Sequence, residues 1–288
     1  MNKSTIYLII FGCALLRLLY EGFFAADNRR PSQVAESDLP PLPDMTPEGR
    51  GTLRRPSRFD QEFNVEEEIK QKNSMFVGTA FSIDDDGTWV TAKHVTDGCD
   101  RVLILTTARQ GMYPTSIFQH PNSDVTVLRT RAGSSALTIE YKMPDYNEEG
   151  FHFGYPRGEP GDIYSHLMGR RIMSSRGREN YKESVLVWSE SVRIPNHNQS
   201  LGGISGGPIL NKSGDVIGIH VAGSQRRGRS FSSLPSAITD LVNQNNIDVE
   251  IEVDVDYLPS SLEVEKLKSS GDLLRKNLTV SKVVCILN

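Results

Sequence analysis

Three residues that could together activate a hydroxyl group stand at well-separated positions in this chain. His94 ends the segment TWVTAKH, Asp124 stands where the polar turn HPNSD leads into the apolar segment VTVLRT, and Ser205 lies in GISGGPILN. A serine hydroxyl is a weak nucleophile at neutral pH unless a base accepts its proton, and a histidine base works best when a carboxylate fixes its tautomer. The three side chains therefore predict a charge-assisted nucleophile, with Ser205 attacking, His94 as the base and Asp124 orienting His94.

The glycines around Ser205 suggest that another group must approach the backbone closely at this point. A turn serine needs only one residue with a positive φ angle, but here glycines precede and follow it. An acyl-transfer reaction develops a negative oxygen that backbone N–H groups can stabilise, and we expect those of Gly203 and Ser205 to form this oxyanion hole. Gly206 and Gly207 would allow the tight turn, and Pro208 would begin the next strand.

Other residues could compete for these roles. Asp97 and Asp100 could orient His94, but they lie close to it in the sequence. The remaining histidines show no metal-ligand spacing and are interpreted as structural or surface residues, so we predict no metal and no cofactor; they are His120, His152, His166 and His197.

The segments that carry the three residues indicate β-structure. Short runs rich in β-branched and aromatic residues alternate with turns such as DDDG and NKSGD, a pattern typical of antiparallel sandwiches and barrels. Only Leu234–Asn246 places apolar residues at helical spacing, at Ile238, Leu241 and Val242. We therefore predict an all-β fold with one late helix.

The blocks TAKHV, SDVTVL and GISGGP resemble, in this order, the signature motifs of the chymotrypsin/trypsin-like serine endopeptidases, and residues 150–170 resemble the opening of the second barrel in bacterial members without disulfides. The resemblance covers about Ser74 to Asn246. It implies two six-stranded antiparallel β-barrels, an active site in the cleft between them, and hydrolysis of proteins or peptides. The competing interpretation is a catalytically idle binding module with a protease fold.

The same resemblance suggests which residues form the primary specificity pocket. Aligned from Ser205, Gln199 falls where trypsins carry an aspartate, which disfavours cleavage after Lys or Arg. His220 in the strand GIHVAGS resembles the histidine with which glutamyl endopeptidases and picornaviral proteases read glutamate or glutamine, whereas Gly223 departs from the serine common in the glutamyl enzymes. A small apolar pocket is the alternative. The pocket residues predicted are Gln199, Ser200, His220, Val221 and Gly223.

The remaining regions differ in composition from this core. In a chain of 288 residues with net charge −4 and no long basic block, we expect no nucleic-acid partner. Residues 1–26 contain a twelve-residue apolar run and read as a cleaved signal peptide or a retained membrane anchor. Residues 27–73 read as a disordered tether, 74–247 as the peptidase domain and 248–288 as an extension without an assigned role.

These features predict a location outside the cytoplasm, either periplasmic, extracellular or membrane-anchored through the N-terminal segment. Cys99 and Cys285 could form one disulfide in an oxidising compartment, or both could stay unpaired, and the sequence leaves the two alternatives open.

Overall fold

The computed structural model of the protein describes residues 51–66, 70–177, 180–196, 200–224, 227–247, 249 and 261–288, and the structural statements below concern these residues. The predicted signal peptide or anchor, residues 1–26, lies outside them, as do residues 27–50 of the predicted tether. Within the described ranges, no helix is both long and apolar enough to cross a membrane.

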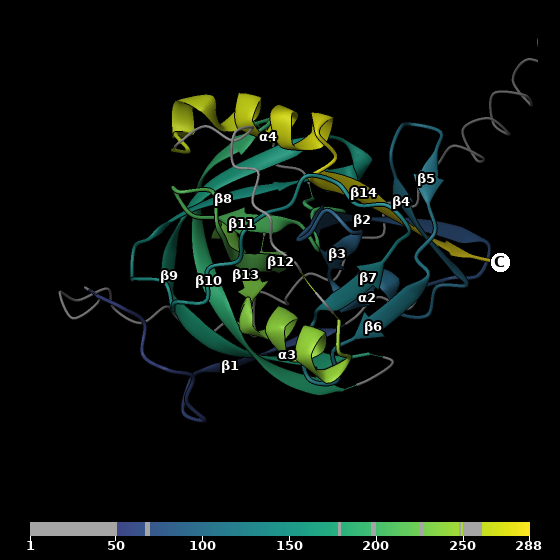
Figure 1. Ribbon diagram of the computed structural model, residues 1–288. Helices are drawn as coiled ribbons and strands as arrows, with labels where there is room; N and C mark the ends of the chain where they lie inside the picture. Colours follow the sequence, from purple (N-terminus) through teal and green to yellow (C-terminus); the bar gives the residue numbers. More distant parts are fainter. Residues whose placement is uncertain are drawn as a thin grey trace, which may run out of the picture. The chain divides into compact units, whose positions relative to one another are not determined.

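The first sheet carries the segments before and after His94. Its order is β5-β4-β14-β2-β3-β7-β6, and all of its pairings are antiparallel (Figure 1). The sheet is therefore built from neighbouring segments of the chain, with one exception, β14. The bounds are β2 (Ser74–Ser82), β3 (Thr88–Thr91), β4 (Arg101–Leu105), β5 (Gly111–Met112), β6 (Ser116–Gln119), β7 (Thr126–Arg129) and β14 (Val280–Leu287).

The second sheet closes on itself. Six of its strands form a ring in the order β8-β9-β10-β13-β12-β11, because β8 pairs with both β9 and β11. A seventh strand, β1, is added outside this ring by parallel pairing with β9. The bounds are β1 (Glu62–Glu66), β8 (Glu149–Gly154), β9 (Gly161–Arg176), β10 (Tyr181–Ile194), β11 (Pro208–Leu210), β12 (Val216–Ser224) and β13 (Arg229–Ser233).

The expectation of an all-β protein with two antiparallel sheets is confirmed, and the strand count needs a correction. Each sheet has seven strands instead of six. The second sheet gains β1, which is also its one parallel strand among the described residues, and the first sheet receives β14 from the C-terminal segment.

Three helices within the described ranges accompany the sheets: α2 (Lys93–Thr96), α3 (Ser236–Gln244) and α4 (Leu267–Lys276). The predicted late helix is α3, which buries Ala237, Ile238 and Leu241 against the core and contacts β7. Helix α4 was not predicted; it contacts β9, β8 and β14 (Figure 1). Two short 3₁₀ turns, Pro156–Gly158 and Val264–Lys266, complete the described elements.

Residues of both sheets share the hydrophobic core. One cluster joins Trp89 of β3 to Val221 of β12 and Phe231 of β13, and another joins Phe81 of β2 to Phe151 of β8. The two indole N–H groups are satisfied, Trp89 by the Thr130 hydroxyl at 3.2 Å and Trp188 by the Ser232 hydroxyl at 2.9 Å. This shared packing fixes the two sheets against each other, so that loops from both can meet.

The C-terminal segment, whose role the sequence left open, forms part of this fold. Strand β14 pairs along its whole length with β2 and over four residues with β4, and it therefore lies inside the first sheet. Helix α4 is fastened by Arg275, whose guanidinium contacts the Asp162 carboxylate of β9 at 2.7 Å in a buried ion pair. The folded unit consequently continues to the last residues of the chain.

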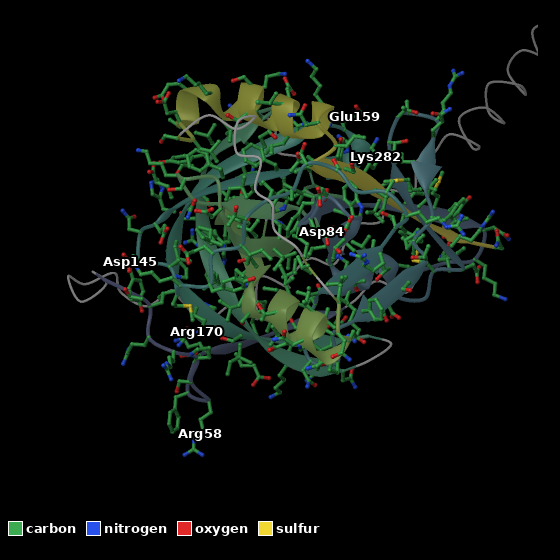
Figure 2. All side chains as sticks on the ribbon, in the orientation of Figure 1. Arg58, Asp84, Asp145, Glu159, Arg170 and Lys282 are labelled. Atoms are coloured by element: carbon green, nitrogen blue, oxygen red, sulfur yellow. A yellow bond between two sulfur atoms is a disulfide. The ribbon has the colours of Figure 1, made fainter. Side chains whose placement is uncertain are left out.

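The end of the predicted tether is also ordered. In β1, Phe63 and Val65 face inward while their neighbours face solvent, so this short amphipathic strand buries one face on the second sheet. Arg170 of β9 holds the preceding segment, because its Nε contacts Asp60 at 2.7 Å and its guanidinium donates to the backbone carbonyls of Arg54 and Arg55 (Figure 2). The expectation of a disordered tether is therefore wrong for residues 51–66.

Candidate active site

The structure brings the side chains of His94 and Asp124 together. Strand β3 ends at Thr91, and the short helix α2 then presents the His94 ring, which is 21% exposed. The backbone N–H of His94 donates to Asp124 Oδ1 at 2.9 Å, and the ring Nδ1 lies 2.6 Å from Oδ2. Because a carboxylate only accepts, Nδ1 carries the proton in this contact, and in the neutral ring Nε2 is then the nitrogen whose lone pair can act as a base.

The two alternative aspartates make other contacts. Asp97 follows α2, where its backbone carbonyl accepts a hydrogen bond from Lys70, and Asp100 Oδ2 accepts one from the backbone of Asn288 at 2.7 Å. The buried Asp124 side chain, by contrast, uses both oxygens on His94.

The turn that carries Ser205 is held by both sheets. Its carbonyl accepts a hydrogen bond from the Thr79 N–H of β2 at 2.8 Å, and the Gly206 N–H donates to the His220 carbonyl of β12 at 2.7 Å. Gly206 has φ +86°, and a Cβ there would stand 2.2 Å from the Thr79 carbonyl oxygen and 2.7 Å from the Ala92 nitrogen. This close approach brings the backbone beside Ser205 next to the segment that leads into His94.

The proposed oxyanion donors are available. Gly203 has φ +101°, and a Cβ at this position would lie 2.5 Å from the Tyr155 carbonyl oxygen. Among the described residues, the N–H groups of Gly203 and Ser205 have no hydrogen-bond partner, although their neighbours Ile204, Gly206 and Gly207 donate within the turn. Unused donors beside a half-buried hydroxyl can stabilise a developing negative oxygen.

Ser205 and His94 both belong to the described part of the chain, and the backbone beside Ser205 lies close to the segment that leads into His94. Hydrogen bonds between a catalytic hydroxyl and its base are often long or poorly aligned without a bound substrate and tighten when one binds.

The predicted pocket residues divide into three groups. Gln199 lies outside the described residues. His220 and Val221 are buried on β12, whereas Ser200 and Gly223 are half-buried. A Cβ at Gly223 would lie 3.9 Å from His220 Nε2 and 3.8 Å from Leu201 Cδ1, so these three residues are neighbours.

His220 belongs to a buried chain of polar groups that the sequence did not reveal. Its Nδ1 lies 3.2 Å from Nδ1 of His152, and His152 Nε2 lies 2.7 Å from the Ser165 hydroxyl, which in turn donates to the Gly150 carbonyl at 3.3 Å. Burial lowers the pKa of His220 to about 3, and the charges of Arg193 and His94 act in the same direction. Burial also lowers the pKa of His152 well below its ordinary value. Both rings are therefore neutral near pH 7.

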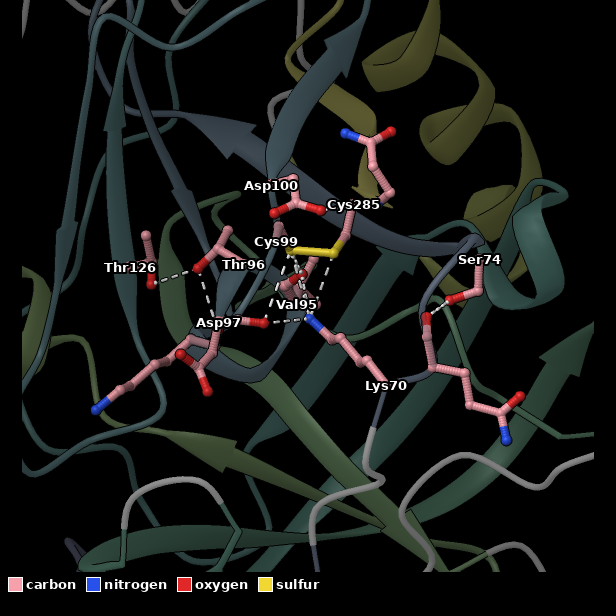
Figure 3. Close-up of a disulfide and its surroundings, with 12 residues drawn as sticks. Lys70, Ser74, Val95, Thr96, Asp97, Cys99, Asp100, Thr126 and Cys285 are labelled. Carbon is pink, nitrogen blue, oxygen red and sulfur yellow. Dashed lines mark hydrogen bonds between the residues drawn. A yellow bond between two sulfur atoms is a disulfide. The ribbon is translucent and has the colours of Figure 1, made fainter.

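The structure settles the alternatives for the cysteines. Cys99 and Cys285 form a disulfide, which fastens the loop after α2 to β14. The ammonium group of Lys70 donates to the carbonyls of Val95 and Asp97 at 3.0 and 2.8 Å, beside the two sulfurs (Figure 3). The segment that follows His94 is consequently held both by the disulfide and by Lys70.

Comparison with known proteins agrees with this arrangement. Residues 78–219 match the trypsin-like peptidase domain family. A probable periplasmic serine endoprotease DegP-like of Pseudomonas fulva is 28% identical over 172 residues, which cover 59% of this chain and 33% of the relative. A protein of the same description from Pseudomonas savastanoi pv. phaseolicola is 27% identical over 209 residues, covering 72% of this chain and 38% of the relative. The chain thus spans well under half the length of these relatives.

Solved structures with similar chains include the active form of the Rv3671c protease from M. tuberculosis, with a TM-score of 0.49 and 15% identity over 63% of this chain and 85% of that one. Another is the HtrA-type protease AlgW with a decapeptide, with a TM-score of 0.47 and 19% identity over 59% of this chain and 52% of that one.

Proposed function

We propose that the chain is a serine endopeptidase that cleaves proteins or peptides through an acyl-enzyme on Ser205, in line with the match of residues 78–219 to the trypsin-like peptidase domain family. The observation that carries this proposal is the paired contact of His94 with Asp124, at 2.9 and 2.6 Å, beside a turn with two unused N–H donors. The description of the relatives as serine endoproteases supports the same reaction class.

In the proposed reaction, the Ser205 oxygen attacks the carbonyl carbon of the scissile bond while His94 Nε2 accepts the hydroxyl proton. The N–H groups of Gly203 and Ser205 stabilise the oxyanion, and Asp124 stabilises the imidazolium. His94 then gives its proton to the leaving amine as the C–N bond breaks. Water, deprotonated by His94, attacks the acyl-enzyme and releases the carboxylic acid, and Ser205 regains its proton.

We also infer that His220 reads the P1 side chain, with glutamine preferred over glutamate. The Ser165 hydroxyl donates its proton to the Gly150 carbonyl, so it can only accept from the Nε2–H group of His152. Nδ1 of His152 is then unprotonated and accepts a hydrogen bond from the Nδ1–H group of His220. Nε2 of the neutral His220 then offers a lone pair on its Gly223 side. A glutamine amide can donate to this lone pair, whereas a carboxylate would be repelled.

The proposed place of action is outside the cytoplasm. The relatives are described as periplasmic, the N-terminal twelve-residue apolar run suits an export signal, and the Cys99–Cys285 disulfide suits an oxidising compartment. Retention of residues 1–26 would make the protein a membrane-anchored peptidase. Removal of these residues would make it a free periplasmic or extracellular one.

Hydrolysis by matched variants tests the proposed activity. With an unfolded protein such as reduced casein as substrate, Ser205→Ala should lower kcat by at least about 10³-fold, and Asp124→Asn should lower it by a similar factor. Ser213→Ala, in the exposed turn between β11 and β12, is the control and should keep wild-type activity. Wild-type protein that is folded but cleaves no peptide bond, or equal cleavage by Ser205→Ala, would refute the proposal.

A further inference from the structure

A buried carboxylate approaches the proposed triad from the second sheet. Glu183 lies on β10 and is 7% exposed. Its Oε1 accepts a hydrogen bond from the Ser123 hydroxyl at 2.5 Å, and its Oε2 accepts one from the Asp124 N–H at 2.8 Å. One side chain of the second sheet thus binds two consecutive residues that lead into β7 of the first sheet.

Glu183 has no counter-ion within the part of the chain that the structure describes. No Lys, Arg or His of the described residues forms an ion pair with it. A buried carboxylate without a cation lowers the stability of a fold, so its presence needs a reason other than packing. A glutamine could make both contacts, since its carbonyl could accept from Asp124 and its amide could donate to Ser123. What the carboxylate adds is negative charge.

The contacts of Glu183 continue directly to His94. The Asp124 backbone is held by Glu183, and the Asp124 carboxylate holds both the backbone and the ring of His94. Asp124 is itself 3% exposed, so water screens little of the interaction between these groups. A substitution of Glu183 should therefore change the position of the His94 ring, its protonation equilibrium, or both.

We propose that Glu183 is a positioning residue for the proposed triad, which clamps the segment Ser123–Asp124 so that the Asp124 carboxylate meets His94, and whose negative charge favours the protonated form of His94. The catalytic meaning of this role rests on the proposed function. The contact between Glu183 and the segment Ser123–Asp124 does not depend on that function.

The surroundings make this charge sensitive to pH near neutrality. Burial raises the pKa of Glu183 to about 7, and the charge of Asp124 adds to the rise, while the hydrogen bonds from Ser123 and Asp124 oppose it. Asp124 is the titratable group that faces Glu183 from the first sheet. On β9, the residue paired with Glu183 is the uncharged Met173, and on β13 the uncharged Ser233 lies beside Glu183. On β10 itself, Tyr181 is another titratable residue, and Lys93 Nζ lies 5.2 Å from the centre of its ring.

The test measures the pKa of the His94 ring by ¹⁵N NMR in the full chain, with Ser205→Ala as background so that self-cleavage cannot interfere. Glu183→Gln keeps the shape and removes the charge, and the His94 pKa should fall by about half a unit to one unit. Glu183→Ala removes the clamp as well, and the downfield Nδ1 proton of His94 should disappear. Glu149→Gln is the control, because Glu149 contacts Tyr164 on the same sheet and not the Ser123–Asp124 segment.

An unchanged His94 titration in Glu183→Gln, together with a retained Nδ1 proton in Glu183→Ala, would overturn the proposal. If Glu183→Ala does not fold, the Glu183→Gln titration alone decides. With Ser205 restored, Glu183→Gln should lower kcat with little change in KM. A shifted His94 pKa in a chain that cleaves nothing would refute the proposed peptidase function and leave the positioning role standing.

Discussion

The burial of His220 decides which side chains the proposed P1 pocket can recognise. A protonated imidazole would attract a glutamate side chain, but burial lowers the pKa of His220 to about 3, and the ring is neutral at any pH above about 4. The protonation state of His220 therefore does not change between pH 5 and pH 8. We expect the ratio of kcat/KM values for glutamine and glutamate substrates to show no dependence on His220 ionisation in this range.

Substitution of His220 tests its role as the reader of the P1 side chain. His220→Ala should lower kcat/KM for glutamine substrates by about 10- to 100-fold and leave alanine substrates largely unaffected. Ser165→Ala frees His152 to change its tautomer, so that His220 can donate through Nε2. The kcat/KM value for glutamate substrates should therefore rise relative to that for glutamine substrates. Cleavage of a matched Gln, Glu and Ala peptide series measures both effects. Equal loss on all three peptides in His220→Ala would mean that His220 serves the fold.

Single residues of the site differ in how far the sequence could reveal them. His94, Asp124 and Ser205 could be predicted because each stands in a local block of characteristic residues. Glu183 contacts residues that lie 59 and 60 positions away, and no local block marks it. A signal was nevertheless present, because Tyr181, Glu183, Val185 and Val187 alternate along β10 and all four are buried. A carboxylate on the inward face of a strand indicates a functional or strained position.

At the level of elements, β14 connects the end of the chain to the His94 segment. It lies between β2 and β4, and its Cys285 is bonded to Cys99, five residues after His94. The disulfide closes a loop across a sequence separation of 186 residues, which restricts the unfolded chain strongly. The cross-link should therefore stabilise the whole folded unit.

The double substitution Cys99→Ser/Cys285→Ser should lower the free energy of unfolding by about 2–4 kcal/mol. Urea unfolding of the oxidised wild type, the reduced wild type and the double variant measures this effect, and the last two should agree. A double variant as stable as the oxidised wild type would show that β14 needs no cross-link.

Elements were predictable where the chain shows its own periodicity. The alternating apolar segments and the spacing of Ile238 and Leu241 identified most strands and α3. Strand β1 was missed because EFNVE is short and is flanked by charged residues, and α4 because it is mostly polar, although Leu267 and Leu274 recur at helical spacing. The β-character of the last segment was visible, but its insertion between β2 and β4 depends on long-range pairing that periodicity does not specify.

For the whole molecule, Glu183 should make stability depend on pH. Its pKa is raised from 4.5 to about 7, so between these values the folded chain holds a proton that the unfolded chain has lost. The contribution of Glu183 to stability is therefore fully present below about pH 4.5, declines as the pH rises, and is lost above about pH 7. The difference corresponds to roughly 3 kcal/mol.

Urea unfolding at pH 5 and pH 8 measures this dependence. The loss of unfolding free energy between the two pH values should be smaller in Glu183→Gln than in the wild type, and Glu149→Gln should behave like the wild type. The same pH dependence in all three proteins would contradict an unpaired, ionisable Glu183 in the fold.

The most direct test of the central claim is the covalent labelling of Ser205 by a fluorophosphonate, which reacts with a serine activated by its base. Folded wild-type protein should gain one label per chain, and peptide mapping should place it on Ser205. His94→Ala and Ser205→Ala should gain none, and Ser213→Ala should label like the wild type. Folded wild-type protein that stays unlabelled, or a label mapped to another residue, would contradict the assignment of this chain as a serine endopeptidase acting through Ser205.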